Sequence, residues 1–339
     1  MPDEFTREYS RRLGTLTGAQ LQAALDRFDL GRLIDAQPAP GGLFGQNVLL
    51  TTTSGGWVLR GCPHYDGQFE KERFFSRAVH ERTEAEAPWP FHIEHATDIF
   101  GWSFALMPLL PGMQVLVPEV RRTLSDDDKV SVAAAFGSYL AQLQSGSWDA
   151  PGEYDYPANE IAPLAEPYRE WFIAGMHARR DQCIAEAGSL TEDDVAWIAS
   201  MVDAGRAALD VPFAPVIVHT DYAEGNVLVE RTEDGFRGSG VFDLGGAYIG
   251  DGEYDLARLG CWYGRQSEPR LRAFIDGYAA GAGGLRAGAR ERLALYIAAD
   301  RLIFWEYGKR NKVWFTDPEQ TFRMFAEPFV EVAQMAAKA

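Results

Sequence analysis

The sequence predicts an α+β fold with two lobes, a small N-terminal lobe rich in β-strands and a larger, mainly helical C-terminal lobe. The chain has 339 residues, which exceeds one average domain and is enough for two lobes that share a site. Short β-branched runs separated by turns fill the first part of the chain, whereas the rest repeats apolar residues at helical spacing. We therefore expect one lobe over residues 1–110, a hinge near 107–111 and a helical lobe over residues 112–339.

The N-terminal lobe is expected to contain a hairpin, one helix and one further strand. The expected elements are, in chain order, a turn-rich segment from Pro38, strands over 47–53 and 57–60, a helix over 69–84 and a buried strand over 104–107. Only Ser54-Gly55-Gly56 separates the first two strands, and a turn of this composition predicts a hairpin. The strand over 104–107 is apolar throughout and ends at Pro108.

The C-terminal lobe is expected to be helical around one non-helical island. Helices are expected from Ser125, from Thr191 and over 290–307, with a loop or insertion over 149–166. An acidic residue follows three positions after both Ser125 and Thr191, which is typical of a capping box. The island comprises strands over 215–219, 226–230 and 240–242, with a turn over 231–239. It therefore forms a small hairpin that has polar residues at both ends.

The composition excludes several classes of protein. Lys and Arg number 32 and Asp and Glu number 49, so the net charge of −17 argues against a nucleic-acid partner. No apolar run is long enough to span a membrane, and we expect no membrane partner. The 3 cysteines lie far apart and cannot all pair, which favours a reduced, cytoplasmic protein. The oligomeric state stays open between monomer and homodimer.

Three polar residues in the island carry the pattern of a phosphoryl-transfer site. Asp221 and Asn226 are separated by four residues, and a short hairpin then leads to Asp243. A carboxylate is needed to accept the proton of an attacking hydroxyl group. Magnesium prefers oxygen ligands, which an amide and a carboxylate supply. The spacing therefore predicts Asp221 as the catalytic base, with Asn226 and Asp243 as Mg²⁺ ligands.

The segment 219–228 resembles the catalytic loop of the aminoglycoside phosphotransferase family, which includes choline-kinase-like and homoserine-kinase-like enzymes. The stretch 250–257, Gly-Asp-Gly-Glu-Tyr-Asp-Leu-Ala, is similar to a second motif of that family. The resemblance implies a bilobal, protein-kinase-like fold, with His219 and Asp255 supporting the loop structurally. The sequence departs from the family pattern at Thr220, where a Gly is usual, and at Ala223-Glu224, where His-Pro is usual.

The resemblance also implies nucleotide contacts in the N-terminal lobe, with ATP or GTP as the phosphoryl donor. Gly42 and Gly45 fall where the family has its phosphate-covering loop, and Arg60 falls where kinases carry the ATP lysine. Arg can grip phosphate with two N–H groups. Glu72 is the expected helix partner of Arg60, and Glu70 competes with it.

The hinge is expected to hold adenine through backbone groups of the segment 107–110, with Met107 and Leu109 as the contacts. The alternative is that this segment is only a core strand.

The acceptor is expected to be a small molecule with a hydroxyl group, most of all an antibiotic. Acidic residues and aromatic residues lie near the motifs, and Glu224, Asp251 and Trp305 are the candidate acceptor contacts. Acids and the net charge slightly favour a polycationic aminoglycoside, and hence a role in antibiotic resistance. Aromatic rings instead favour a capuramycin-type nucleoside antibiotic or a macrolide. A choline-like or homoserine-like metabolite stays open.

The sequence supports two alternative functions less well. The chain could be an inactive scaffold that only binds nucleotide, but the intact set of Asp221, Asn226 and Asp243 favours an active enzyme. Protein kinase activity is disfavoured because the short span from Asp243 to Asp251 leaves no room for a peptide-docking loop. No Walker-type loop and no G-x-S-x-G motif occur in the sequence.

Overall fold

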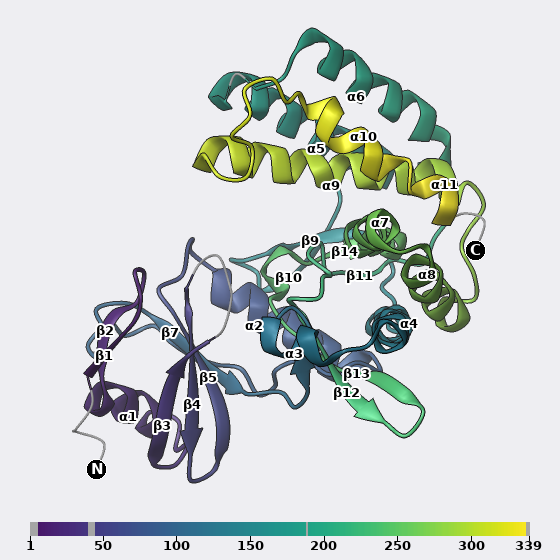
Figure 1. Cartoon of the computed structure of the whole chain (residues 1–339). Helices are drawn as coiled ribbons and strands as arrows, with labels where there is room; N and C mark the ends of the chain where they lie inside the picture. Colours follow the sequence, from purple (N-terminus) through teal and green to yellow (C-terminus); the bar gives the residue numbers. More distant parts are fainter. Residues whose placement is uncertain (1–5, 40–44, 188, 337–339) are drawn as a thin grey trace.

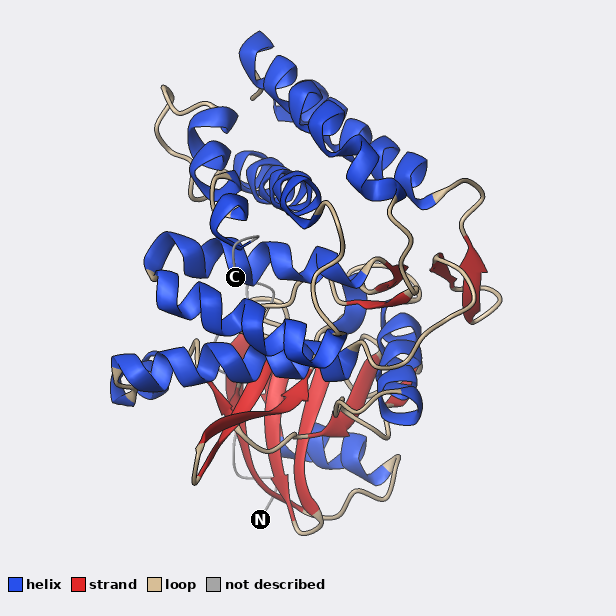
Figure 2. Ribbon diagram, turned by 90° about the vertical axis from the view of Figure 1, so that its right-hand side faces the viewer, coloured by secondary structure: helices blue, strands red, loops and turns tan. Residues whose placement is uncertain are grey.

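The computed structural model describes residues 6–39, 45–187 and 189–336, and it confirms the expected α+β architecture. A strand-rich N-terminal part lies against a C-terminal part in which helices dominate (Figure 1). Seen from the side, most strands gather in the lower part of the molecule and most helices lie above them (Figure 2).

The N-terminal part is built on a five-stranded antiparallel sheet of order β3-β4-β5-β7-β6. Its elements are β1 (Thr6–Ser10), β2 (Gly14–Thr17), α1 (Gly18–Asp26), β3 (Leu33–Pro38), β4 (Asn47–Thr52), β5 (Gly55–Gly61), α2 (Gln68–Arg82), β6 (His92–Glu94) and β7 (Phe104–Pro108). The predicted hairpin is formed by β4 and β5, and Gly55 at its turn has a φ of 140°, which favours glycine. This register places Arg60 opposite Asn47, at the end of the hairpin away from the turn.

The C-terminal part contains nine α-helices within the described residues. They are α3 (Pro118–Thr123), α4 (Asp126–Leu143), α5 (Tyr168–Gln182), α6 (Glu192–Gly205), α7 (Leu256–Gln266), α8 (Glu268–Ala282), α9 (Ala289–Asn311), α10 (Phe322–Val330) and α11 (Ala333–Ala336). Ser125 and Thr191 are the N-caps of α4 and α6, and both form the predicted capping box. The helix expected over 290–307 lies within α9.

Helices α4 and α8 pack closely against each other, and α4 also contacts the segment that contains Asp221. A Cβ atom on Gly137 of α4 would collide with the carbonyl oxygen of Phe274 of α8, so glycine permits this approach. The carbonyl oxygen of Phe136 accepts a hydrogen bond of 2.8 Å from the hydroxyl of Tyr222. This hydrogen bond attaches the segment that contains Asp221 to helix α4.

Two small sheets complete the C-terminal part. One consists of β8 (Met113–Gln114), β12 (Val227–Thr232) and β13 (Gly235–Val241), and the other has the order β10-β9-β14-β11. The second contains β9 (Gly152–Asp155), β10 (Glu160–Pro163), β11 (Val216–Val218) and β14 (Tyr248–Gly250). The segment 149–166, predicted as a loop or insertion, therefore contains a hairpin, and the loop alternative is wrong in its middle part. The polar, Pro-rich composition of this segment did not indicate strands. The hairpin of β9 and β10 joins a sheet whose other strands, β14 and β11, are distant in the sequence.

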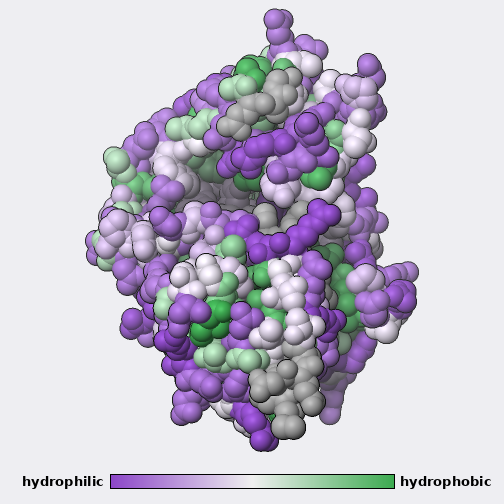
Figure 3. Space-filling view, turned by 90° about the vertical axis from the view of Figure 1, so that its left-hand side faces the viewer, coloured by the Kyte–Doolittle hydropathy of each residue, from purple (hydrophilic) through white to green (hydrophobic). Residues whose placement is uncertain are grey.

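One face of the molecule is drawn in space-filling form (Figure 3). Figure 3 shows that the face on the N-terminal side is largely hydrophilic and carries only small hydrophobic patches. Within the described ranges, no helix is long and apolar enough to cross a membrane.

Candidate active site

The loop 219–226 connects β11 to β12 and carries two of the three predicted polar residues. Asp243 follows β13, which pairs antiparallel with β12. Because Asn226 precedes β12 and Asp243 follows β13, the two residues lie at the same end of this hairpin. The N–H of Phe242 donates to the carbonyl of Asn226 at 3.1 Å, which fixes that end. The island thus brings the predicted residues together.

Asp255 anchors the loop through two backbone hydrogen bonds. Its Oδ2 accepts the N–H of His219 at 2.7 Å, and its Oδ1 accepts the N–H of Thr220 at 2.8 Å. The side chain is buried, and burial raises the pKa of this carboxyl to about 7. The structure thus places Asp255 against the loop, and the structural role that the resemblance implies for it stays a prediction.

His219 links the loop to β13 through both ring nitrogens. Nε2 lies 2.9 Å from the carbonyl oxygen of Phe242, and Nδ1 accepts the N–H of Asp221 at 3.2 Å. These partners require a neutral ring protonated on Nε2. Burial lowers the pKa of this imidazole, which favours the same form. His219 therefore holds the backbone of Asp221 and has no open nitrogen for acid–base work.

Thr220 has a φ of 69°, in the left-handed region that favours glycine. The residue lies between His219 and Asp221, and its N–H is one of the two that Asp255 accepts. The sequence departs from the resembled family at this position, and the backbone keeps the conformation that a glycine there would adopt without strain.

Asn226 contacts the backbone of Asp221 within the loop. The Nδ2 of Asn226 donates to the carbonyl oxygen of Asp221 at 2.9 Å, which leaves its Oδ1 open to a cation. The Asp221 side chain is 47% exposed and that of Asp243 is 37% exposed. Oxygen atoms from an amide and a carboxylate form a donor set that fits Mg²⁺.

Arg60 connects the N-terminal sheet to this set. Its Nε and Nη2 lie 2.9 Å from Glu72 Oε2 and Oε1, and Nη2 also lies 3.0 Å from Asp243 Oδ1. The sequence left Glu70 and Glu72 open as partners, and Arg60 contacts Glu72. Glu70 instead lies 3.4 Å from the Nε2 of His95. One guanidinium group therefore joins β5, α2 and the C-terminal part.

The predicted nucleotide contacts have mixed outcomes. Gly42 lies outside the described residues. Gly45 has a φ of 58°, and its carbonyl accepts the Ser10 hydroxyl at 2.5 Å. The N–H of Leu109 donates to the carbonyl of Gly56 at 3.0 Å, so this donor is not open to a base, and the predicted backbone contact at Leu109 stays a prediction that depends on its carbonyl. Met107 is buried in the ladder between β5 and β7, and only its backbone could reach a nucleotide.

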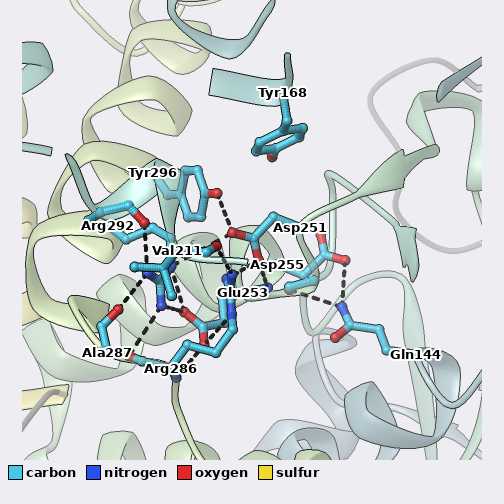
Figure 4. Close-up of polar contacts among 12 residues, drawn as sticks. Gln144, Tyr168, Val211, Asp251, Glu253, Asp255, Arg286, Ala287, Arg292 and Tyr296 are labelled. Atoms are coloured by element: carbon cyan, nitrogen blue, oxygen red, sulfur yellow. Dashed lines mark hydrogen bonds and ion pairs between the residues drawn. The ribbon is translucent and has the colours of Figure 1, made fainter. Parts of the chain in front are cut away.

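All three predicted acceptor contacts are buried. The Oε1 of Glu224 binds Arg270 at 2.6 Å, and Asp251 accepts the hydroxyl of Tyr296 at 2.7 Å and pairs with Arg286 (Figure 4). Trp305 is fully buried, and its Nε1 lies 3.2 Å from the Ser189 hydroxyl. The prediction that these residues contact the acceptor is therefore wrong. A buried carboxylate needs a cationic or hydrogen-bonding partner, and the chain supplies it internally.

Sequence reasoning missed Arg258. Its Nη1 contacts the Oδ1 of Asp221, and its Nη2 lies 2.8 Å from Asp300 Oδ1. A signal existed, because Arg258 follows the Asp-Leu-Ala motif and lies three positions after Asp255. Residues at this spacing share a helix face, so both can reach the same loop.

Comparison with known proteins gives one family match. The family model described as "Phosphotransferase enzyme family" matches residues 35–296. Homoserine kinase from Neisseria meningitidis serogroup B is 26% identical over 299 residues, which are 84% of this chain and 86% of that protein.

Solved structures share the fold. The GDP complex of aminoglycoside 2'-phosphotransferase-IIIa has a TM-score of 0.62 at 14% identity and covers 97% of this chain and 99% of its own. A thermostable mutant of aminoglycoside phosphotransferase APH(4)-Ia has a TM-score of 0.59 at 17% identity, with coverage of 93% and 96%. These likenesses confirm the expected protein-kinase-like fold.

Thr220→Gly should stabilise the protein. A non-glycine residue in the left-handed region costs about 1–2 kcal/mol, part of which the greater backbone entropy of glycine offsets. We expect the free energy of unfolding to rise by about 0.5–1 kcal/mol, measured by urea titration. Thr232→Gly, at the exposed end of β12, is the matched control and should lower it. A loss of stability in Thr220→Gly would show that the hydroxyl contributes more than the strain costs.

Asp255→Asn should change the pH dependence of stability. The pKa of this carboxyl is raised to about 7 from 3.8, so its contribution is fully present below the unfolded pKa and is lost as pH rises through about 7. Asparagine does not titrate. The wild-type advantage in unfolding free energy over Asp255→Asn should therefore shrink between about pH 4 and pH 7, and an advantage that grows over this range would refute the buried, raised pKa.

Proposed function

The chain belongs to the phosphotransferase enzyme family, and from its site we propose that it transfers the γ-phosphoryl group of ATP or GTP to a small-molecule hydroxyl with Asp221 as the base. Membership makes it a phosphotransferase that acts on a hydroxyl group of a small molecule. The assignment of residues to roles is the proposal, and it extends to the division of labour between the lobes, with nucleotide binding in residues 1–110 and the acceptor site in residues 112–339.

One observation carries the proposal. The 219–226 loop and the end of β13 place Asp221, Asn226 and Asp243 together, and Asp255 and His219 fix that loop by four hydrogen bonds to buried or backbone groups. The half-exposed Asp221 carboxylate is the group available to accept the proton of an acceptor hydroxyl. Positioning the attacking hydroxyl in line with the transferred phosphoryl group accounts for most of the rate enhancement in phosphoryl transfer.

Asn226 and Asp243 would hold Mg²⁺, because the Asn226 Oδ1 is open and the Asp243 carboxylate is partly exposed. The ion would neutralise charge on the nucleotide phosphates when bound. Arg60 contacts both Glu72 and Asp243, and its guanidinium is suited to bind a phosphate oxygen while Glu72 keeps it in place.

The acceptor side of the site does not favour a polycation. The acids that made an aminoglycoside attractive are paired internally, namely Glu224 with Arg270, Asp251 and Glu253 with Arg286 and Arg292, and Glu306 with Arg179. In addition, the guanidinium of Arg258 lies against Asp221, and its charge repels an ammonium group beside the reacting hydroxyl. The geometry supports an acceptor that is neutral or carries an anionic group.

L-homoserine is the first candidate acceptor, because the homoserine kinase relative matches over 84% of this chain. An aminoglycoside, with a role in antibiotic resistance, is the second candidate. The net charge of −17 favours it, since an acidic surface attracts polycations. Kanamycin and hygromycin B occur in the solved complexes of structural neighbours, whose low identity supports only the shared fold.

Asp221→Asn should remove most of the turnover while nucleotide affinity is kept. The amide keeps the size of the side chain but cannot accept the hydroxyl proton, so we expect kcat to fall by roughly 10²–10⁴. Turnover is measured by coupled ADP release, and affinity by calorimetry. Asp127→Asn, on the exposed first turn of α4, is the matched control and should keep full activity. An Asp221→Asn variant with more than a tenth of wild-type kcat would remove Asp221 from the role of base.

An acceptor panel separates the two candidates. Wild-type protein with Mg²⁺ and ATP or GTP is incubated with L-homoserine, kanamycin or hygromycin B, and products are detected by the mass of one added phosphoryl group. We expect homoserine to be the better acceptor, with a kcat/KM that changes little with salt. A preferred aminoglycoside, with kcat/KM falling steeply as salt screens charges beyond about 8 Å at 0.15 M, would overturn the charge argument.

A further inference from the structure

Arg258 of α7 contacts Asp221 directly from outside the 219–226 loop. Its Nη1 donates to the Oδ1 of Asp221, while Nε and Nη2 both lie 2.8 Å from the Oδ1 of Asp300 on α9. The Arg258 side chain is only 16% exposed, and Asp300 is buried. One guanidinium group therefore bridges a solvent-facing carboxylate and a buried one.

Asp300 keeps Arg258 in a fixed position. Both of its oxygens are occupied, Oδ1 by Arg258 and Oδ2 by Arg301. A buried carboxylate cannot release such partners without a large desolvation cost. The ring of Phe304 also lies 4.8 Å from the Arg258 guanidinium carbon and 4.3 Å from that of Arg301. Arg258 thus has electrostatic and packing restraints that do not involve Asp221.

Charges alternate along this chain of four residues, from Asp221 through Arg258 and Asp300 to Arg301. The positive charge of Arg258 is shared between two carboxylates, so it can bind Asp221 without neutralising it alone. The contact uses Oδ1 of Asp221, and Oδ2 accepts no hydrogen bond from any side chain in the described part of the protein. A carboxylate held at one oxygen presents the other in a single direction.

We propose that Arg258 is a positioning residue that holds Oδ1 of Asp221 and so aims Oδ2 at the acceptor hydroxyl. The inference rests on the proposed role of Asp221 as the base. Without Arg258, a half-exposed aspartate side chain would sample several rotamers, and few of them would face the hydroxyl. Arg258 itself does not touch the reacting atoms, so its whole effect on turnover should pass through Asp221.

The test is a double-mutant cycle on the full-length protein. Arg258→Ala should lower kcat by roughly 10- to 100-fold, the usual cost of misplacing a catalytic group, while KM for the nucleotide stays within about twofold. In the Asp221→Asn background the same substitution should have no further effect on kcat. Turnover is followed as ADP release with the best acceptor of the panel and also with water as the acceptor, so a measurement exists whichever acceptor is correct.

Two further variants distinguish the positioning of Asp221 from a general effect of the substitution on the fold. Arg258→Lys keeps the charge but cannot span both carboxylates, and should retain more kcat than Arg258→Ala. Added guanidinium should restore part of the kcat of Arg258→Ala but not that of the Asp221→Asn variant. The matched control is Arg121→Ala, which removes an arginine that faces Glu224 of the same loop at 3.7 Å and should leave kcat unchanged.

The outcomes separate this inference from the proposed function. Wild-type kcat in both Arg258 variants, with Asp221→Asn inactive, would overturn the positioning role and leave the base intact. An Arg258→Ala effect of equal size in both backgrounds would also overturn it, since the residue would then act on the fold. A higher kcat in Arg258→Ala than in the wild type would also overturn it, because the contact would then hold Asp221 in an unproductive orientation. An active Asp221→Asn variant would instead refute the proposed base.

Discussion

The Asp255 carboxylate is the constraint on which the site depends, because it accepts the N–H groups of His219 and Thr220 at once. Two adjacent N–H groups can converge on one carboxylate only if the backbone turns sharply, and Thr220 provides the turn with its φ of 69°. Gln144, the C-cap of α4, connects this anchor to the helical core, because its Nε2 lies 3.4 Å from Asp255 Oδ2 and its Oε1 accepts the Tyr278 hydroxyl at 3.0 Å. The direction of Asp221 is therefore set by helices that lie behind the loop.

Buried arginine–carboxylate pairs are the second organising feature of the C-terminal part. Asp251 and Glu253 are almost fully buried and are satisfied by Arg286, Arg292 and Tyr296 (Figure 4). Removing either partner of such a pair would leave an uncompensated charge in the interior, which costs several kcal/mol, about 3–5. These pairs hold the segment before α7 in place, and they neutralise buried acidic residues within a strongly acidic sequence.

The sequence predicted the elements whose cause is local. The hairpin of β4 and β5, the capped starts of α4 and α6, and the order of Asp221, Asn226 and Asp243 all follow from spacing within short segments. The hairpin of β9 and β10 was missed because its pairing partner, β14, lies far along the chain. Burial of Glu224, Asp251 and Trp305 was missed for the same reason, since their partners come from α8, α9 and the segment before α6. Arg258 could have been found from its position three residues after Asp255.

The central claim is that Asn226 and Asp243 hold the metal while Arg60 binds phosphate, with Asp221 facing the acceptor. A crystal structure with Mg²⁺ and a non-hydrolysable ATP analogue tests it most directly. We expect Mg²⁺ about 2.1 Å from Asn226 Oδ1 and from an Asp243 oxygen, with Arg60 still in contact with Glu72 and also bound to a phosphate oxygen. A metal ion bound away from both residues, or a nucleotide whose γ-phosphate points away from Asp221, would contradict it.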